Sequence, residues 1–215
     1  VVIVAILFMR IPLPEIKEEE NEIPTETVSK RSLWHYPHFV FGLLALFFYV
    51  AAQTGVNSFF INFATESSVS ITAKQAGLML SLGGMGLFLV GRLAGSWLLS
   101  RVRAARLLLI FAAGAILCMA VVIADFGWIS LIALFLTYLF ESIMFPTIFL
   151  MSIVGLGEHT KRASSFLVMS IVGGAIAPVC MGAIGESSIS VGFIIPLFCF
   201  IFIEAFAKWY SKAKI

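Results

Sequence analysis

Long apolar runs are the feature that most restricts what this sequence can fold into. Six such runs follow one another after residue 36, at 37–63, 75–99, 104–124, 128–154, 163–185 and 189–209. A helix needs about 20 mostly apolar residues to cross the hydrocarbon core of a bilayer. No regular alternation of apolar and polar residues is present, so a membrane β-barrel is not expected. The runs predict an all-α integral membrane protein whose bundle of six helices occupies residues 36–210.

The composition argues against a soluble domain. Hydrophobic residues make up 60% of the chain and charged residues 12%, whereas soluble domains carry about 25% charged residues. The net charge is only +2, so no nucleic acid partner is expected. No phosphate-binding loop, metal-ligand spacing or nucleophile elbow is found. We therefore predict no enzyme activity, no cofactor and no metal, and we expect the scattered His35, His38 and His159 to be surface residues.

The first 35 residues differ from the rest. Residues 1–9 are apolar but cover about half of a span, so we expect them to be the end of a preceding transmembrane helix whose beginning is missing. Residues 10–35 include three prolines and six of the twelve acidic residues. This stretch predicts a solvated cytoplasmic loop between two helix bundles, with an interaction segment as the alternative.

Basic residues predict the orientation in the membrane, because Lys and Arg collect on the cytoplasmic side. With six crossings, one side receives twelve of the fourteen: Arg10, Lys17, Lys30, Arg31, Arg101, Arg103, Arg106, Lys161, Arg162, Lys208, Lys212 and Lys214. The other side receives only Lys74, and Arg92 lies inside a span. The loops near 64–74, 125–127 and 186–188 are therefore predicted to face outward. The tail at 211–215 is predicted to be cytoplasmic.

Polar residues in the first full span are candidate ligand contacts. Tyr49, Gln53 and Asn57 are spaced by four residues and so share one face of a helix, and Asn62 follows. Amide and hydroxyl groups in a row can hydrogen-bond the hydroxyls of a sugar. The alternative is that they hold neighbouring helices together, as polar side chains in membrane bundles often do.

Two charged residues also lie inside spans, where they are costly. Arg92 lies about 13 Å along the helix from Arg101; it either snorkels to the interface, pairs with a carboxylate or points into a pathway, and the neighbouring Gly91 and Gly95 allow close helix packing. Glu141 is either protonated, paired, part of an ion relay or hydrogen-bonded to a neighbouring helix.

Two further expectations concern local geometry. Pro146 frees a backbone carbonyl one turn earlier and predicts a kink in the fourth span, and bends are also expected at Pro178 and Pro196. Glu204 and Lys208 have the i, i+4 spacing of a surface ion pair.

Several motifs together resemble one known family. They are Ala52-Gln53-Thr54, Gly91-Arg92, Gly95-Ser96-Trp97-Leu98, Ser100-Arg101, Phe145-Pro146-Thr147-Ile148-Phe149, Gly155-Leu156-Gly157, Thr160-Lys161, Ser164-Ser165-Phe166 and Val172-Gly173-Gly174. Across most of residues 34–209 the sequence resembles the fucose–galactose–glucose:proton symporters of the major facilitator superfamily, closest to their L-fucose permease branch. Residues 91–103 lack the acidic residue usual in the superfamily's loop at this place, which puts its charge latch in doubt.

The resemblance implies twelve helices in two bundles, with a monosaccharide bound between them and alternating access. This chain would then be the C-terminal bundle, helices 7–12, in a bacterial inner membrane. The partners implied are a sugar, a proton or sodium ion, the lipid bilayer and a missing N-terminal six-helix bundle, which would hold most of the coupling carboxylates. The equivalent of Glu141 is often uncharged in the family, so the resemblance assigns it no role.

The leading hypothesis is therefore secondary active uptake of a monosaccharide by cation, most simply proton, symport. The candidate substrate-binding residues are Gln53, Asn57, Asn62, Arg92, Glu141, Tyr138 and Phe145, the last two as an apolar face for a sugar ring. The alternatives are a carrier of the same superfamily for another small solute, and a receptor-like membrane protein that does not transport.

Overall fold

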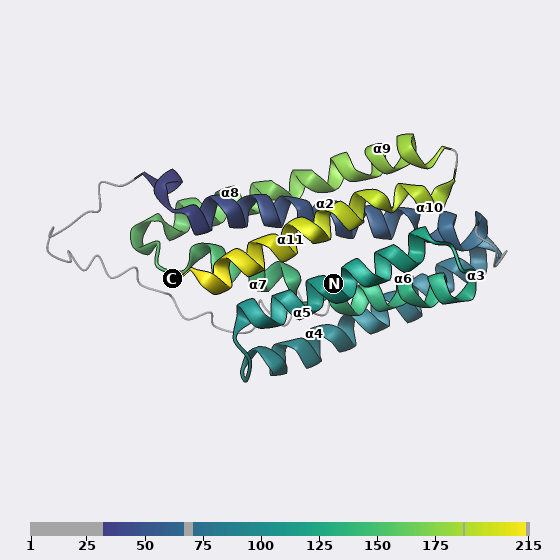
Figure 1. Cartoon of the computed structure of the whole chain (residues 1–215), viewed down its shortest axis with the longest axis horizontal. Helices are drawn as coiled ribbons and strands as arrows, with labels where there is room; N and C mark the ends of the chain where they lie inside the picture. The colour runs from purple at the N-terminus through teal and green to yellow at the C-terminus, as the bar shows by residue number, and fades with distance from the viewer. Residues whose placement is uncertain (1–31, 67–70, 187, 214–215) are drawn as a thin grey trace, which may run out of the picture. The chain divides into compact units, whose positions relative to one another are not determined.

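A computed structural model describes residues 32–66, 71–186 and 188–213. The predictions made for residues 1–31, including the preceding helix and the acidic loop, lie outside this part of the chain. The described residues form helices and no strand (Figure 1). Six of these helices are long and apolar enough to cross a membrane: Pro37–Glu66, Ala73–Leu99, Ala104–Ile123, Trp128–Ile153, Gly157–Gly185 and Ile189–Lys212. The six spans predicted from the sequence are confirmed, with ends that differ by a few residues.

Two of the six spans are continuous helices, α2 (Pro37–Glu66) and α5 (Ala104–Ile123). The second span comprises α3 (Ala73–Leu78), the π-helix η2 (Met79–Gly84) and α4 (Met85–Leu99). The fourth is divided into α6 (Trp128–Glu141) and α7 (Met144–Ile153). The fifth runs through η3 (Gly157–His159), α8 (Thr160–Met169), η4 (Ser170–Val172) and α9 (Gly173–Gly185), and the sixth through α10 (Ile189–Gly192) and α11 (Ile194–Lys212). A short 3₁₀ turn, η1 (Leu33–His35), precedes α2.

Helix α2 lies among α7, α9 and α11, and α5 packs against both α6 and α11 (Figure 1). Small residues permit the close contacts of α2. A Cβ added at Gly42 would collide with the Ser152 side chain on α7, and one at Gly55 would lie 2.5 Å from the Met181 sulfur on α9. Side chains that face away from the bundle are apolar, such as Leu82 and Val179. An apolar outer surface of this kind is what contact with the hydrocarbon of a bilayer requires.

Coverage by neighbouring helices differs strongly among the spans. In an apolar stretch of 18 residues, 56% of the α2 span is buried, whereas the Ala73–Leu99 and Gly157–Gly185 spans reach only 17% and 28%. These two spans therefore present most of their surface to lipid or to a further part of the protein.

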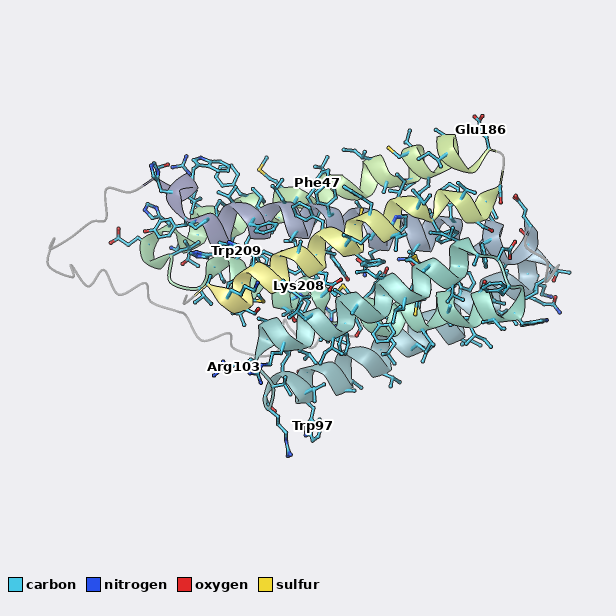
Figure 2. All side chains as sticks on the ribbon, in the orientation of Figure 1. Phe47, Trp97, Arg103, Glu186, Lys208 and Trp209 are labelled. Atoms are coloured by element: carbon cyan, nitrogen blue, oxygen red, sulfur yellow. The ribbon has the colours of Figure 1, made fainter. Side chains whose placement is uncertain are left out.

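The two ends of the bundle carry different charges. Arg103, Lys208 and Trp209 lie at one end and Glu186 lies at the other (Figure 2). Trp97 extends outward from α4 near the basic end, and the Arg101 guanidinium lies over its ring at 4.5 Å. Arg101 and Arg103 both belong to the short connection between α4 and α5.

Several local predictions can be checked against the fold. The Glu204–Lys208 pair is confirmed, with a nitrogen–oxygen distance of 2.5 Å. The expectation for His38 is wrong: the residue is only 6% exposed and lies close to the backbone of Val154. The sequence position of His38 at the start of a helix suggested a surface residue, but the turn that follows α7 covers it.

Candidate functional site

The polar face predicted for the first span is present on α2. The Tyr49 side chain is fully enclosed, whereas Gln53 and Asn57 are half-buried. The Asn57 side-chain oxygen is buried and has no hydrogen-bond partner among the described residues. Gln53 and Asn57 therefore keep part of their surface exposed on this face, although the Asn57 side-chain oxygen itself is enclosed.

Asn62 does not join this group. It lies five residues after Asn57, which is about 140° around the helix, and its side chain is exposed near the end of α2. The backbone carbonyl oxygen of Asn62 accepts a hydrogen bond from the Thr65 hydroxyl at 3.1 Å. The structure thus places Asn62 apart from Gln53 and Asn57.

The fourth span is interrupted where Pro146 predicts a kink. Helix α6 ends at Glu141 and α7 begins at Met144. Pro146 has no N–H to donate to the carbonyl of Ser142, and the side chain of Ser142 bonds the Leu139 carbonyl at 2.7 Å. The helix is thus interrupted by a two-residue turn, Ser142–Ile143, close to the place where the sequence predicts a kink.

Tyr49 contacts the fourth span at this break. Its hydroxyl donates a hydrogen bond of 3.0 Å to the backbone carbonyl of Glu141. Its ring also lies 6.0 Å from the ring of Phe145, on the far side of the break. One side chain of α2 therefore contacts both halves of the interrupted span.

The Glu141 side chain is enclosed in the bundle. It has 0% exposure, and neither carboxyl oxygen has a hydrogen-bond partner among the described residues. The hydroxyl of Tyr138, one turn earlier on α6, is also buried without a partner there. The carboxyl lies within electrostatic range of both Tyr49 and Tyr138. In this conformation Glu141 and Tyr138 are out of reach of a ligand.

Helix α4 packs against the same break through its glycines. A Cβ on Gly91 would lie 2.6 Å from the Ser142 hydroxyl oxygen and 2.8 Å from the Leu139 carbonyl oxygen, and one on Gly95 would collide with Ile143. The GxxxG spacing therefore brings α4 onto the junction between α6 and α7. This close packing accounts for the presence of Gly91 and Gly95, so no separate role in ligand binding is needed to explain them.

Arg92, next to Gly91, is exposed on α4. Its guanidinium lies 5.5 Å from the Phe88 ring centroid and within electrostatic range of the Tyr49 hydroxyl. Among the described residues Arg92 has no carboxylate within ion-pair distance. Of the alternatives drawn from the sequence, pairing with a carboxylate is therefore not seen in this part of the chain.

Phe145 is half-buried and stacks on Phe149 at a centroid distance of 6.2 Å with nearly parallel rings. It remains partly accessible, unlike Tyr138. Gln53, Asn57 and Phe145 are thus the half-buried members of the predicted set, whereas Asn62 and Arg92 are exposed and Tyr138 and Glu141 are enclosed. A groove of about 510 Å³ between α2 and α11 is lined by residues such as Trp34, Phe41 and Trp209 and by none of the predicted contacts.

The π-helix η2 is a feature that sequence reasoning missed. It contains Gly83 and Gly84, which let the rings of Phe135 and Tyr138 on α6 approach closely. π-Turns within helices often occur at functional sites. The signal in the sequence was the cluster of glycines between residues 83 and 95, of which only Gly91 and Gly95 were considered above, as residues that allow close helix packing.

Comparisons with known proteins identify the family. The chain matches the family model of the Major Facilitator Superfamily over residues 1–178. The chain belongs to the Major Facilitator Superfamily. This membership, with the six spans, confirms the predicted multi-pass membrane fold.

Two curated relatives and one solved structure of the superfamily are similar along nearly all of the chain. A glucose/galactose transporter of Brucella abortus is 32% identical over 98% of this chain. The L-fucose-proton symporter of Escherichia coli is 36% identical over 99%. The crystal structure of the transporter FucP in the outward conformation superposes with a TM-score of 0.84 at 33% identity, again over 99% of this chain.

The chain spans about half the length of the curated relatives it matches. It covers 51% of the Brucella protein, 49% of the Escherichia coli protein and 52% of the FucP chain. The resemblance seen in the sequence to the sugar:proton symporters is confirmed.

Proposed function

We propose that this chain is the C-terminal six-helix half of a twelve-helix transporter that takes up a monosaccharide of the fucose, galactose or glucose class by cation symport with alternating access. The similarity of 98–99% of the chain to sugar transporters at 32–36% identity carries the proposal. A proton is the cation the relatives favour, because the Escherichia coli relative is a proton symporter. A sodium ion is the alternative.

The second bundle would cover the helices that are least buried in this chain. The Ala73–Leu99 and Gly157–Gly185 spans have only 17% and 28% of an apolar 18-residue stretch buried. They are also interrupted, by η2 and by η4. Interrupted helices beside a cavity are common in secondary transporters, which supports a substrate pathway along these two spans.

In this half, Gln53 and Asn57 on α2 would hydrogen-bond the sugar hydroxyls and Phe145 would pack against the ring. An amide presents both donors and acceptors, and sugar hydroxyls need both. Arg92 would lie at the edge of the pathway. Asn62, Glu141 and Tyr138 would not touch the sugar in the conformation described, since Asn62 lies on another face and the other two are enclosed.

The orientation follows from the basic residues. The end with Arg101, Arg103, Arg162 and Lys212 would face the cytoplasm of a bacterial inner membrane, with the C-terminus on that side. Cysteines introduced one at a time at two exposed positions test this, once Cys118, Cys180 and Cys199 have been replaced by serine. Ser188→Cys should react with a membrane-impermeant thiol reagent in intact cells, and Ser211→Cys should react only after lysis. The reverse pattern would overturn the orientation.

The test of transport uses the full-length parent protein reconstituted in vesicles. Uptake of labelled fucose, galactose, glucose and N-acetylglucosamine is measured with and without an inward proton gradient, and then a sodium gradient. Accumulation of one sugar that depends on a gradient supports symport and names substrate and ion. If no sugar accumulates under either gradient, the carrier for another solute or the receptor-like protein replaces the proposal.

A further inference from the structure

A carboxyl group without a partner lies in the middle of the membrane-spanning bundle. Glu141 is fully buried, and neither of its oxygens bonds to any other described residue. An ionised carboxylate taken out of water costs several kcal/mol unless it is paired. Ionisable residues inside membrane spans are therefore rare and are usually functional.

The titratable groups near this carboxyl are two tyrosines. Tyr138 lies one turn earlier on α6 with an unpartnered hydroxyl, and Tyr49 lies on α2; Arg92 on α4 lies within electrostatic range of the Tyr49 hydroxyl. Tyr49 does not bond the carboxyl, because its hydroxyl donates to the Glu141 backbone carbonyl at 3.0 Å. Arg92 is exposed and forms no ion pair with it. No charged side chain in the described part of the chain thus serves as partner to Glu141.

The position of Glu141 in the fold adds a second observation. It is the last residue of α6, and Ser142 and Ile143 separate it from α7. Tyr49 covers the junction from one side, while Gly91 and Gly95 bring α4 onto it. A change in the angle between α6 and α7 would therefore uncover this carboxyl.

We propose that Glu141 takes up a proton in one state of the transport cycle and releases it in another, which makes it a proton-coupling residue within this bundle. The carboxylate takes a proton from water while the junction between α6 and α7 is open to one side of the membrane. It stays a neutral carboxyl while enclosed, as in this conformation, and returns the proton to water when the junction opens to the other side. This inference rests on the proposed symport, and it differs from an arrangement in which every coupling carboxylate lies outside this chain.

The test compares Glu141→Gln with Glu158→Gln in the full-length parent in vesicles. Glu158 is an exposed carboxylate in the turn before α8 and serves as the matched control. For each protein, sugar exchange without a gradient and accumulation driven by an inward proton gradient are both measured. The ratio of accumulation to exchange should fall at least tenfold in Glu141→Gln and stay within twofold in Glu158→Gln. An unchanged ratio in Glu141→Gln overturns the proposal.

If Glu141→Gln exchanges no sugar at all, a second variant is needed to separate a proton-coupling role from a structural one. Glu141→Asp keeps a carboxyl and should retain coupled uptake with a displaced pH profile. Uptake with the pH profile of the parent, or no uptake at all, indicates a structural role and overturns the proposal. The two hypotheses fail separately, because a parent that accumulates no sugar refutes symport itself. If the parent accumulates sugar and Glu141→Gln accumulates it equally well, only the role of Glu141 is refuted.

Discussion

The hydrogen bond from Tyr49 to the Glu141 carbonyl gives a direct test of the packing at the helix break. Tyr49→Phe removes the donor and keeps the ring, and the bond it removes is 3.0 Å long and buried. Hydrogen bonds between membrane helices average about 0.6 kcal/mol and reach about 1.7. Leaving a buried carbonyl without a donor costs about 1–3 kcal/mol. We expect a loss of about 1–1.7 kcal/mol in the free energy of unfolding.

Tyr138→Phe is the matched control. Its hydroxyl is buried near the same carboxyl but has no partner among the described residues. Removing a buried hydroxyl that bonds nothing relieves its desolvation cost. Tyr138→Phe should therefore leave stability unchanged or raise it, although the two substitutions are chemically identical and both rings are enclosed.

Thermal unfolding of the full-length parent in detergent measures both variants. At about 2–4 °C per kcal/mol for domains of this size, Tyr49→Phe should lower Tm by about 2–7 °C. Scans at two heating rates control for irreversible unfolding. Equal losses in the two variants, or no loss in Tyr49→Phe, would refute the reasoning, because the hydroxyl of Tyr49 would then make no specific bond.

Three further predictions follow from the packing and the polar residues. Gly95→Leu should destabilise the protein by about 1–3 kcal/mol or prevent folding, because its side chain would overlap the break in the fourth span, whereas Gly86→Ala, with open space around it, should be neutral in the same thermal assay. Asn57→Ala should raise the KM for the transported sugar at least tenfold, while Asn62→Ala should change it less than twofold; equal effects would contradict the different faces of these residues. Glu204→Gln should cost less than about 0.5 kcal/mol in thermal unfolding, since its ion pair is of the exposed i, i+4 type.

The spans could be predicted because their signal is local. The free energy of moving about 20 consecutive residues into lipid depends on those residues alone, and the six predicted spans match the helices found. The break at Pro146 was also predictable, because proline removes a backbone donor wherever it occurs in a helix. The row of Tyr49, Gln53 and Asn57 followed from helical periodicity.

The partners of the polar residues could not be predicted. Tyr49 bonds a carbonyl 92 residues away in sequence, and no local pattern indicates which helix will lie beside it. His38 was expected at the surface, yet the turn after α7 covers it. The ion pair between Glu204 and Lys208 could be predicted, by contrast, because both residues belong to one helix and their spacing along it fixes their separation.

The amino-acid sequence was enough to show that residues 37–212 contain six membrane spans, where those spans lie and which residues are costly in lipid. The folded bundle was needed to show that Gly91 and Gly95 bring α4 onto the turn after Glu141, and that this carboxyl is enclosed without a partner in the described part of the chain. The difference arises because insertion into a bilayer is a sum over neighbouring residues. Burial and pairing inside the bundle depend on which helices pack together, and that is set by contacts between residues far apart in the chain.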